Sequence, residues 1–131
     1  MTMPDAYLKE SITTASPAQL VLALYDGVLM AVDRAGEDLS GGAPGAMESA
    51  HWELVRAQKI LTELRAALDH DRGGQISRSL ASIYEFCLER LVQANVTKNP
   101  SPLGVVSEAI GGLRDAWEQA CVTQDGVLVP A

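Results

Sequence analysis

The feature that most limits the fold of this 131-residue sequence is a run of apolar residues spaced alternately three and four apart. Such spacing places the side chains on one face of an α-helix, because about 3.6 residues make one turn. A glycine pair at 73–74 follows the run and is expected to end that helix, together with Arg72. The run occupies these positions: Met47, Ala50, Leu54, Ala57, Leu61, Leu64 and Leu68.

Three other segments show similar spacing. The first begins with Ser16, Pro17 and Gln19, which are the residue types of a capping box with proline in the first turn, and the stretch 40–45, rich in glycine, ends it. A later helix is predicted from Ile76 up to the break at 99–102, and a last one follows that break. The three apolar faces hold, in turn, Val21, Tyr25, Val28, Val32, Ala35 and Leu39; Leu80, Ile83, Cys87, Leu91 and Ala94; and Leu103, Val106, Ile110, Leu113, Trp117 and Ala120.

Four such helices joined by short loops form an antiparallel four-helix bundle. We therefore predict an all-α protein with a bundle over residues 16–122, a short N-terminal arm or extra short helix over residues 1–15, and a C-terminal tail over residues 123–131. The arm carries Tyr7 and Leu8, and Ile12 follows them. These residues are equally compatible with an arm that packs on the bundle and with one that moves freely.

The charge balance argues against several classes of partner. Lys and Arg total 10 against 17 for Asp and Glu, a net charge of −7, which repels nucleic-acid phosphates and anionic lipid. No signal peptide is recognisable, and no apolar run approaches the ~20 residues of a membrane span. Cys87 and Cys121 lie within apolar helical patterns. We expect them to be buried free thiols of a cytoplasmic protein that neither binds nucleic acid nor inserts into a membrane.

Metal or catalytic chemistry finds little support in the sequence. Glu48 and His51 have the Glu-x-x-His spacing of di-iron carboxylate bundles, but that motif has to recur on a second helix. The other histidine, His70, has Ala67 where a glutamate is required. No phosphate-binding loop and no activated nucleophile are recognisable either. We therefore expect no metal, no cofactor and no enzymatic activity.

Apolar residues also lie outside the regular faces, along two further lines. Gly111 and Gly112 stand side by side within the last predicted helix, where each glycine costs about 1 kcal/mol relative to alanine. The pattern is equally compatible with residues that complete the core or seat the arm, and with a groove that accepts another helix or an extended segment. The third helix carries one line and the fourth the other: Ala81, Tyr84, Leu88 and Val92; Val105, Ala109, Gly112 and Ala116.

The sequence also resembles a known family. The stretch TASPAQLVLALYDGVL, residues 14–29, resembles the signature of the FliS family of flagellar export chaperones. Residues 57–69, 73–95 and 113–120 resemble later helices of that family in the same order, and Tyr7 matches an aromatic residue near its N-terminus. The resemblance covers most of residues 7–120.

The resemblance implies a cytoplasmic four-helix bundle that binds the disordered C-terminal region of flagellin. Such a chaperone prevents premature polymerisation of flagellin and delivers it to the flagellar type III export apparatus. It implies an arm that covers part of the client site in the free protein, and a component of the export gate as a further partner. Little or no homo-oligomerisation is expected. The alternative is a generic helical adaptor or dimerisation module that binds another amphipathic helix.

The candidate partner-binding residues combine the arm, the additional apolar lines and the segments that match the family. Gln58, Arg90 and Asn95 lie in matched segments, where bonding to a client backbone and ordinary surface pairing are equally compatible with the sequence. Within the family signature, we expect Tyr25 to pack in the core with a bonded hydroxyl and Asp26 to be solvated or to pair with another helix. The full partner-binding set is Tyr7, Leu8, Ile12, Gln58, Tyr84, Leu88, Leu91, Val92, Asn95, Ala109, Gly112 and Ala116.

Overall fold

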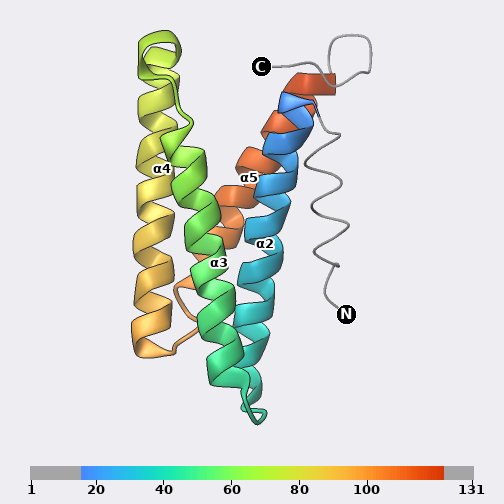
Figure 1. Ribbon diagram of the computed structural model, residues 1–131, viewed down its shortest axis with the longest axis vertical. Coiled ribbons are helices and arrows are strands. Elements are labelled where there is room, and N and C mark those ends of the chain that lie inside the picture. Colours follow the sequence, from blue (N-terminus) through green and yellow to red (C-terminus); the bar gives the residue numbers. More distant parts are fainter. Residues whose placement is uncertain (1–15, 123–131) are drawn as a thin grey trace.

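The computed structural model describes residues 16–122, so the predicted arm and tail lie outside the described residues. The described residues form four α-helices: α2 (Pro17–Gly41), α3 (Ala46–Ala66), α4 (His70–Thr97) and α5 (Leu103–Val122). Successive helices run in opposite directions, as Figure 1 shows. The helices contact one another in the ring order α2–α3–α4–α5–α2, and neither diagonal pair makes close backbone contact. The predicted all-α, antiparallel four-helix bundle is confirmed.

The start of α2 follows the sequence prediction. The Ser16 hydroxyl accepts a hydrogen bond from the backbone N–H of Gln19 at 3.2 Å, and the Gln19 side chain accepts one from the Ser16 N–H at 3.0 Å. Pro17 occupies the first helical position, where a missing N–H removes no helical hydrogen bond. The helix ends at Gly41, and Gly42 caps it in the left-handed conformation. The capping box is therefore confirmed.

The boundary between the second and third helices differs from the prediction. α3 ends at Ala66, and the Asp69 side chain accepts hydrogen bonds from two backbone N–H groups of the next turn at 3.1 and 3.0 Å. This N-cap starts α4 before the glycine pair is reached. Gly74, with φ 51° and ψ −122°, then interrupts the first part of α4. The prediction that residues 73–74 end the second helix is wrong, because Asp69 begins a new helix first.

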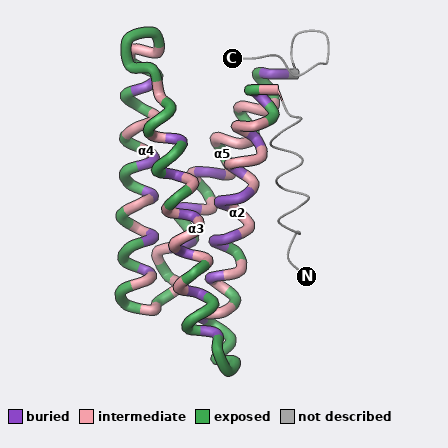
Figure 2. Tube along the Cα trace, viewed as in Figure 1, coloured by how far each residue is buried: buried purple, intermediate pink, exposed green. Residues whose placement is uncertain are grey.

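One apolar core lies along the axis of the bundle, and buried positions recur on the inner side of each helix (Figure 2). Met47, predicted in the core, is 42% exposed because Ala46 and Ala50 take the buried positions at the start of α3. At the other end of the chain, Ala120 is exposed and Cys121 is buried instead. The largest fully buried side chains are Leu54, Leu61, Leu91, Ile110, Val28, Val106 and Cys87.

Two findings bear on the other predictions. Cys87 and Cys121 are buried free thiols, as predicted. Burial raises the pKa of the Cys87 thiol to about 11, because the low-dielectric interior disfavours the thiolate. Among the four described helices, none combines the length and the apolar character that a membrane crossing needs.

Candidate functional site

Three consecutive residues in the middle of α2 join it to the other three helices, beginning with Tyr25. The hydroxyl oxygens of Tyr25 and Tyr84 lie 2.6 Å apart, which links α2 to α4 through the core. Both tyrosines are almost fully buried, and burial raises the pKa of each. The predicted role of Tyr25 is confirmed. Tyr84 is a core residue and not part of a surface line, because its hydroxyl bonds that of Tyr25.

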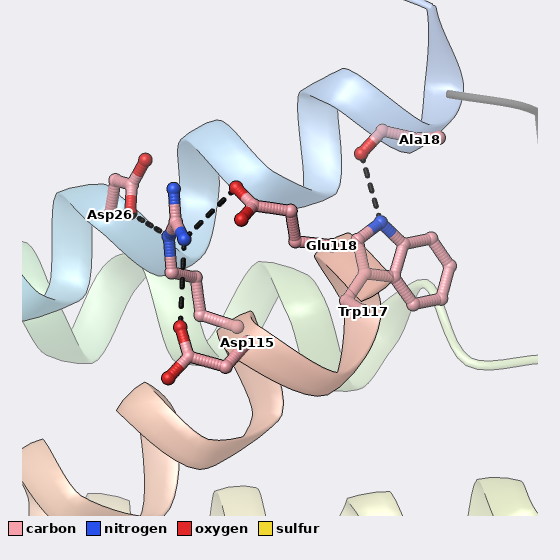
Figure 3. Close-up of polar contacts among 6 residues, drawn as sticks. Ala18, Asp26, Asp115, Trp117 and Glu118 are labelled. Carbon is pink, nitrogen blue, oxygen red and sulfur yellow. Dashed lines mark hydrogen bonds and ion pairs between the residues drawn. The ribbon is translucent and has the colours of Figure 1, made fainter. Parts of the chain in front are cut away.

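Asp26 joins α2 to α5. Its carboxylate accepts a hydrogen bond from Nε of Arg114 at 2.8 Å, so the expected helix-pairing role is the one observed. The Arg114 guanidinium also pairs with Asp115 and Glu118 of its own helix, at 3.6 and 3.0 Å. Figure 3 shows the carboxylates of Asp26, Asp115 and Glu118 arranged around this guanidinium.

Trp117 makes a second contact between these helices. Its indole N–H donates a hydrogen bond to the backbone carbonyl of Ala18 at 3.0 Å (Figure 3). Ala18 is fully buried near the start of α2, and this contact lies about two turns of α2 from the ion pair of Asp26. The two contacts hold the second half of α5 against the first half of α2.

Gly27 joins α2 to α3 by close approach. A Cβ atom placed on Gly27 would lie 3.1 Å from Cδ1 of Ile60, closer than apolar atoms normally pack. The absence of a side chain therefore lets α3 lie near α2 at this point. Tyr25, Asp26 and Gly27 thus contact α4, α5 and α3 in turn, and this triplet has a structural role.

One candidate surface lies on the flank of α4 that faces α3. Leu88 and Val92 line a shallow depression of about 470 Å³ together with Arg65 of α3. Nearby, the Asn95 side chain lies 3.1–3.3 Å from Nδ1 of His51 and also contacts Lys98. His51 is partly exposed, as predicted. No three potential metal ligands cluster within residues 16–122.

A second candidate surface lies on the flank of α4 turned away from α3 and on the flank of α5 turned away from α2. Gly112 is two residues from Arg114, which is about 200° around the helix, so it lies on the side of α5 turned away from α2. Phe86 is likewise two residues from Leu88, on the side of α4 turned away from α3. Phe86 is 44% exposed, and the Arg90 guanidinium lies 5.4 Å from the centre of its ring. Both flanks are therefore solvent-exposed and distinct from those that α4 and α5 present to α3 and α2.

The additional apolar lines of the third and fourth helices do not form one groove. The line through Leu88 and Val92 faces α3, whereas the line of small residues through Gly112 is exposed on the side of α5 turned away from α2. The suggestion of a single groove between them is therefore corrected, because α4 sits between α3 and α5 and presents a different flank to each. A Cβ at Gly112 would meet no atom within 4 Å, so this part of α5 is open.

Comparison with known proteins identifies the family of this chain. The family model described as "Flagellar protein FliS" matches residues 2–124. The chain belongs to the FliS family. The flagellar secretion chaperone FliS of Bacillus subtilis (strain 168) is 35% identical over 115 residues, which cover 88% of this chain and 83% of that protein.

Further FliS relatives show similar coverage. The flagellar secretion chaperone FliS of Salmonella typhimurium is 32% identical over 113 residues, covering 86% of this chain and 82% of the relative. The flagellar secretion chaperone FliS of Vibrio cholerae is 30% identical over 119 residues, which cover 88% of this chain and 85% of that relative. The resemblance that the sequence motifs indicated is thus confirmed. The family is one of chaperones and not of enzymes.

The candidate residues of this FliS-family chain fall into three groups. Leu91 is fully buried, and Tyr84 is 2% exposed, so both fill the core behind the surface. The arm residues Tyr7, Leu8 and Ile12 lie outside the described residues. The remaining candidates are partly or fully exposed: Gln58, Leu88, Val92, Asn95, Ala109, Gly112 and Ala116.

The structure also exposes apolar residues that the sequence analysis did not single out. Val96 is 78% exposed, Ile76 is 72% exposed and Trp52 is 60% exposed. Trp52 and Val96 lie off the regular apolar faces of α3 and α4, and counting large apolar residues outside the three-four spacing would have found them. Ile76 keeps that spacing, four residues before Leu80, so its exposure could not be read from the pattern.

Proposed function

We propose that this chain is a cytoplasmic chaperone that binds the disordered C-terminal region of flagellin, prevents its premature polymerisation and delivers it to the flagellar type III export apparatus. Membership of the FliS family, with relatives named flagellar secretion chaperones, supports this proposal. The observation that carries the binding role is the apolar surface of α4. Its exposed large side chains are Ile76, Phe86, Val92 and Val96.

A disordered client needs such a surface. Ordering a flexible segment on binding costs conformational entropy, and burial of apolar area offsets that cost. The two flanks of α4 offer apolar area toward α3 and on the side turned away from α3. A client segment that crosses both flanks buries more apolar surface than either flank provides alone. No nucleotide or metal is needed for this kind of binding.

The line of small residues on α5 allows a client segment to approach the backbone of that helix closely. Ala109, Gly112 and Ala116 leave room for a helix or an extended chain to lie near the backbone of α5. Phe86 offers a large apolar contact on α4. On the other flank of α4, Leu88, Val92, Asn95 and Gln58 form the second part of the proposed site, and the arm with Tyr7, Leu8 and Ile12 covers part of it when no client is bound.

A pair of glycine substitutions on α5 tests the proposal. Gly112 and Gly104 both have open space around them, but Gly104 lines a hollow on the α2 side of α5. In calorimetric titrations with a peptide of the flagellin C-terminal region, we expect Gly112→Leu to weaken binding at least tenfold and Gly104→Leu to leave it unchanged. Circular dichroism checks that both variants keep their helix content. Normal binding by Gly112→Leu would exclude the α5 line as part of the site.

The same titration separates the proposal from a general adaptor or dimerisation module. Light scattering on the free chain and on the mixture gives the masses of both. A monomer that gains one peptide agrees with a chaperone of low self-association. A stable dimer of the free chain that ignores the peptide would favour the dimerisation module. An export-gate component, a further proposed partner, is tested by adding it to the preformed complex.

A further inference from the structure

A separate hollow lies between α2 and α3. Its volume is about 200 Å³, below the ~300 Å³ at which pockets for drug-sized ligands begin. A hollow of this size suits one side chain of a protein partner better than a small molecule. The residues that shape it are Ala23, Leu24 and Gly27 of α2 and Arg56, Lys59, Ile60 and Glu63 of α3.

The floor of the hollow is apolar and depends on Gly27. Leu24 and Ile60 pack against the core but keep part of their surface exposed. A Cβ on Gly27 would already lie 3.1 Å from Cδ1 of Ile60, so any side chain there would crowd the floor. The floor thus offers contact to an aliphatic group from outside.

The rim carries positive charge on an acidic protein. Arg56 and Lys59 lie one turn apart on α3, and neither makes an ion pair with another described residue. Glu63 is the one carboxylate among the lining residues. The whole chain has a net charge of −7, so two unpaired cations side by side are a local exception. Beside an apolar floor, they favour binding of an acidic ligand. The guanidinium of Arg56 can donate two parallel hydrogen bonds to a carboxylate.

The hollow opens on a different side of α3 from the proposed client surface. Leu24 and Ile60 line the groove between α2 and α3, whereas Leu88 and Val92 line the depression between α3 and α4. A partner at the hollow and a client on the α4 side need not exclude each other. Simultaneous binding is what a delivery partner requires.

We propose that this hollow docks a short acidic segment of a partner protein other than the client. One aliphatic side chain of the segment enters between Leu24 and Ile60 above Gly27, and neighbouring carboxylates pair with Arg56 and Lys59. The apolar contact supplies part of the affinity, and the charges orient the segment and exclude basic sequences.

The probe for this proposal is a capped peptide with one Leu flanked by aspartates, titrated into the full, isotope-labelled chain and followed by NMR. We expect shifts at the Gly27 amide and the Ile60 methyl groups. Peptides with Gly in place of Leu, or Lys in place of Asp, should produce none at equal concentration. The double variant Arg56→Glu/Lys59→Glu should weaken binding about tenfold, since two attractive exposed pairs become repulsive.

Arg65→Glu is the matched control. Arg65 lies on the same helix but lines the depression that faces α4, and its reversal changes the net charge in the same direction. We expect binding of the probe to change by less than about twofold. An equal loss with Arg65→Glu would show that the acidic peptide responds only to overall charge, and would overturn the proposal.

Two further outcomes would also overturn it. If the flagellin peptide displaces the acidic probe, the hollow belongs to the client site. If Tyr7→Ala and Leu8→Ala shift the Gly27 and Ile60 signals with no peptide present, the occupant is the arm of the chain itself. Binding of the acidic probe to a chain that ignores flagellin would instead refute the proposed function and leave this inference standing.

Discussion

α2 and α4 are both long helices of the same bundle, yet they use their surfaces differently. α2 buries nine of its 25 residues and exposes no large apolar side chain, whereas α4 buries five of 28 and exposes four. Tyr25, Asp26 and Gly27 join α2 to each of the other helices. The difference shows that α2 holds the bundle together, while the unused flanks of α4 are the place to look for a binding surface.

The sharpest test of this contrast is a pair of adjacent substitutions on α4. Leu91 is fully buried and Val92 is 49% exposed. Leu91→Ala leaves a cavity and should lower the free energy of unfolding by about 3 kcal/mol. Val92→Ala should change it by less than about 0.5 kcal/mol. Urea unfolding followed by circular dichroism measures both values, and similar losses would mean that Val92 also belongs to the core.

The next largest effect concerns the tyrosine pair that joins α2 to α4. Tyr25→Phe or Tyr84→Phe leaves the other hydroxyl buried without a partner, and each should lower the free energy of unfolding by about 1–2 kcal/mol. The double variant should lose less than the sum of the two single losses, because it leaves no orphan hydroxyl. Strictly additive losses in this mutant cycle would contradict a specific link.

The same pair predicts a pH dependence. In the unfolded chain a tyrosine ionises near pH 10, whereas burial holds the pKa of Tyr25 and Tyr84 higher in the folded protein. The unfolded chain therefore loses protons first, and stability should fall as the pH rises above about 10. The pKa of Cys87 is raised from 9.0 to about 11, so this thiol should make the loss of stability begin about one pH unit lower. The Tyr25→Phe/Tyr84→Phe variant should show a shallower fall in unfolding experiments from pH 8 to 11.

A smaller effect distinguishes the glycines on the two sides of the molecule. Gly112→Ala should raise the free energy of unfolding by up to about 1 kcal/mol, since alanine favours the helix and nothing lies within 4 Å of the new methyl group. Gly27→Ala should not raise the free energy of unfolding, because the close contact of its methyl group with Ile60 offsets the helix preference of alanine. Thermal unfolding of the two variants measures the difference. Equal stabilisation would mean that α3 does not depend on the absence of a side chain at Gly27.

The smallest expected effect is that of the ion pair between α2 and α5. Asp26→Asn should lower the free energy of unfolding by about 0.5 kcal/mol, because the pair with Arg114 is partly exposed to solvent. The loss should shrink at high salt. Asp33→Asn is the control, since Asp33 is exposed on the same helix and pairs with no other described residue. Equal effects of the two variants would assign no specific role to the contact.

Much of the fold could be predicted because the governing interactions are local. The cap of α2 involves residues three apart, and the apolar spacing of Leu54, Leu61 and Leu91 repeats within single helices. The end of α3 was missed because two local signals compete there. Asp69 and the glycines at 73–74 both favour a boundary, and their order along the chain decided which acted first.

The candidate site was less predictable, because exposure depends on which helices are neighbours. Tyr84 and Val92 were placed in one apolar line, but the hydroxyl of Tyr25 draws Tyr84 into the core, while Val92 stays at the surface. In the same way, the lines through Leu88 and Gly112 were paired by sequence pattern alone. One faces α3 and the other is exposed on α5, which no spacing within one helix can reveal.

The sequence by itself determined the number of helices, most of their limits, the apolar face of each, and membership of the FliS family. Periodicity, caps and motifs all depend on residues that are close together in the chain. Only the tertiary structure decided that Asp26 meets Arg114, that Gly27 admits Ile60, and which flank of each helix stays uncovered. Those outcomes depend on how helices distant in the chain are rotated against one another, and that rotation is set by the packing of the whole core.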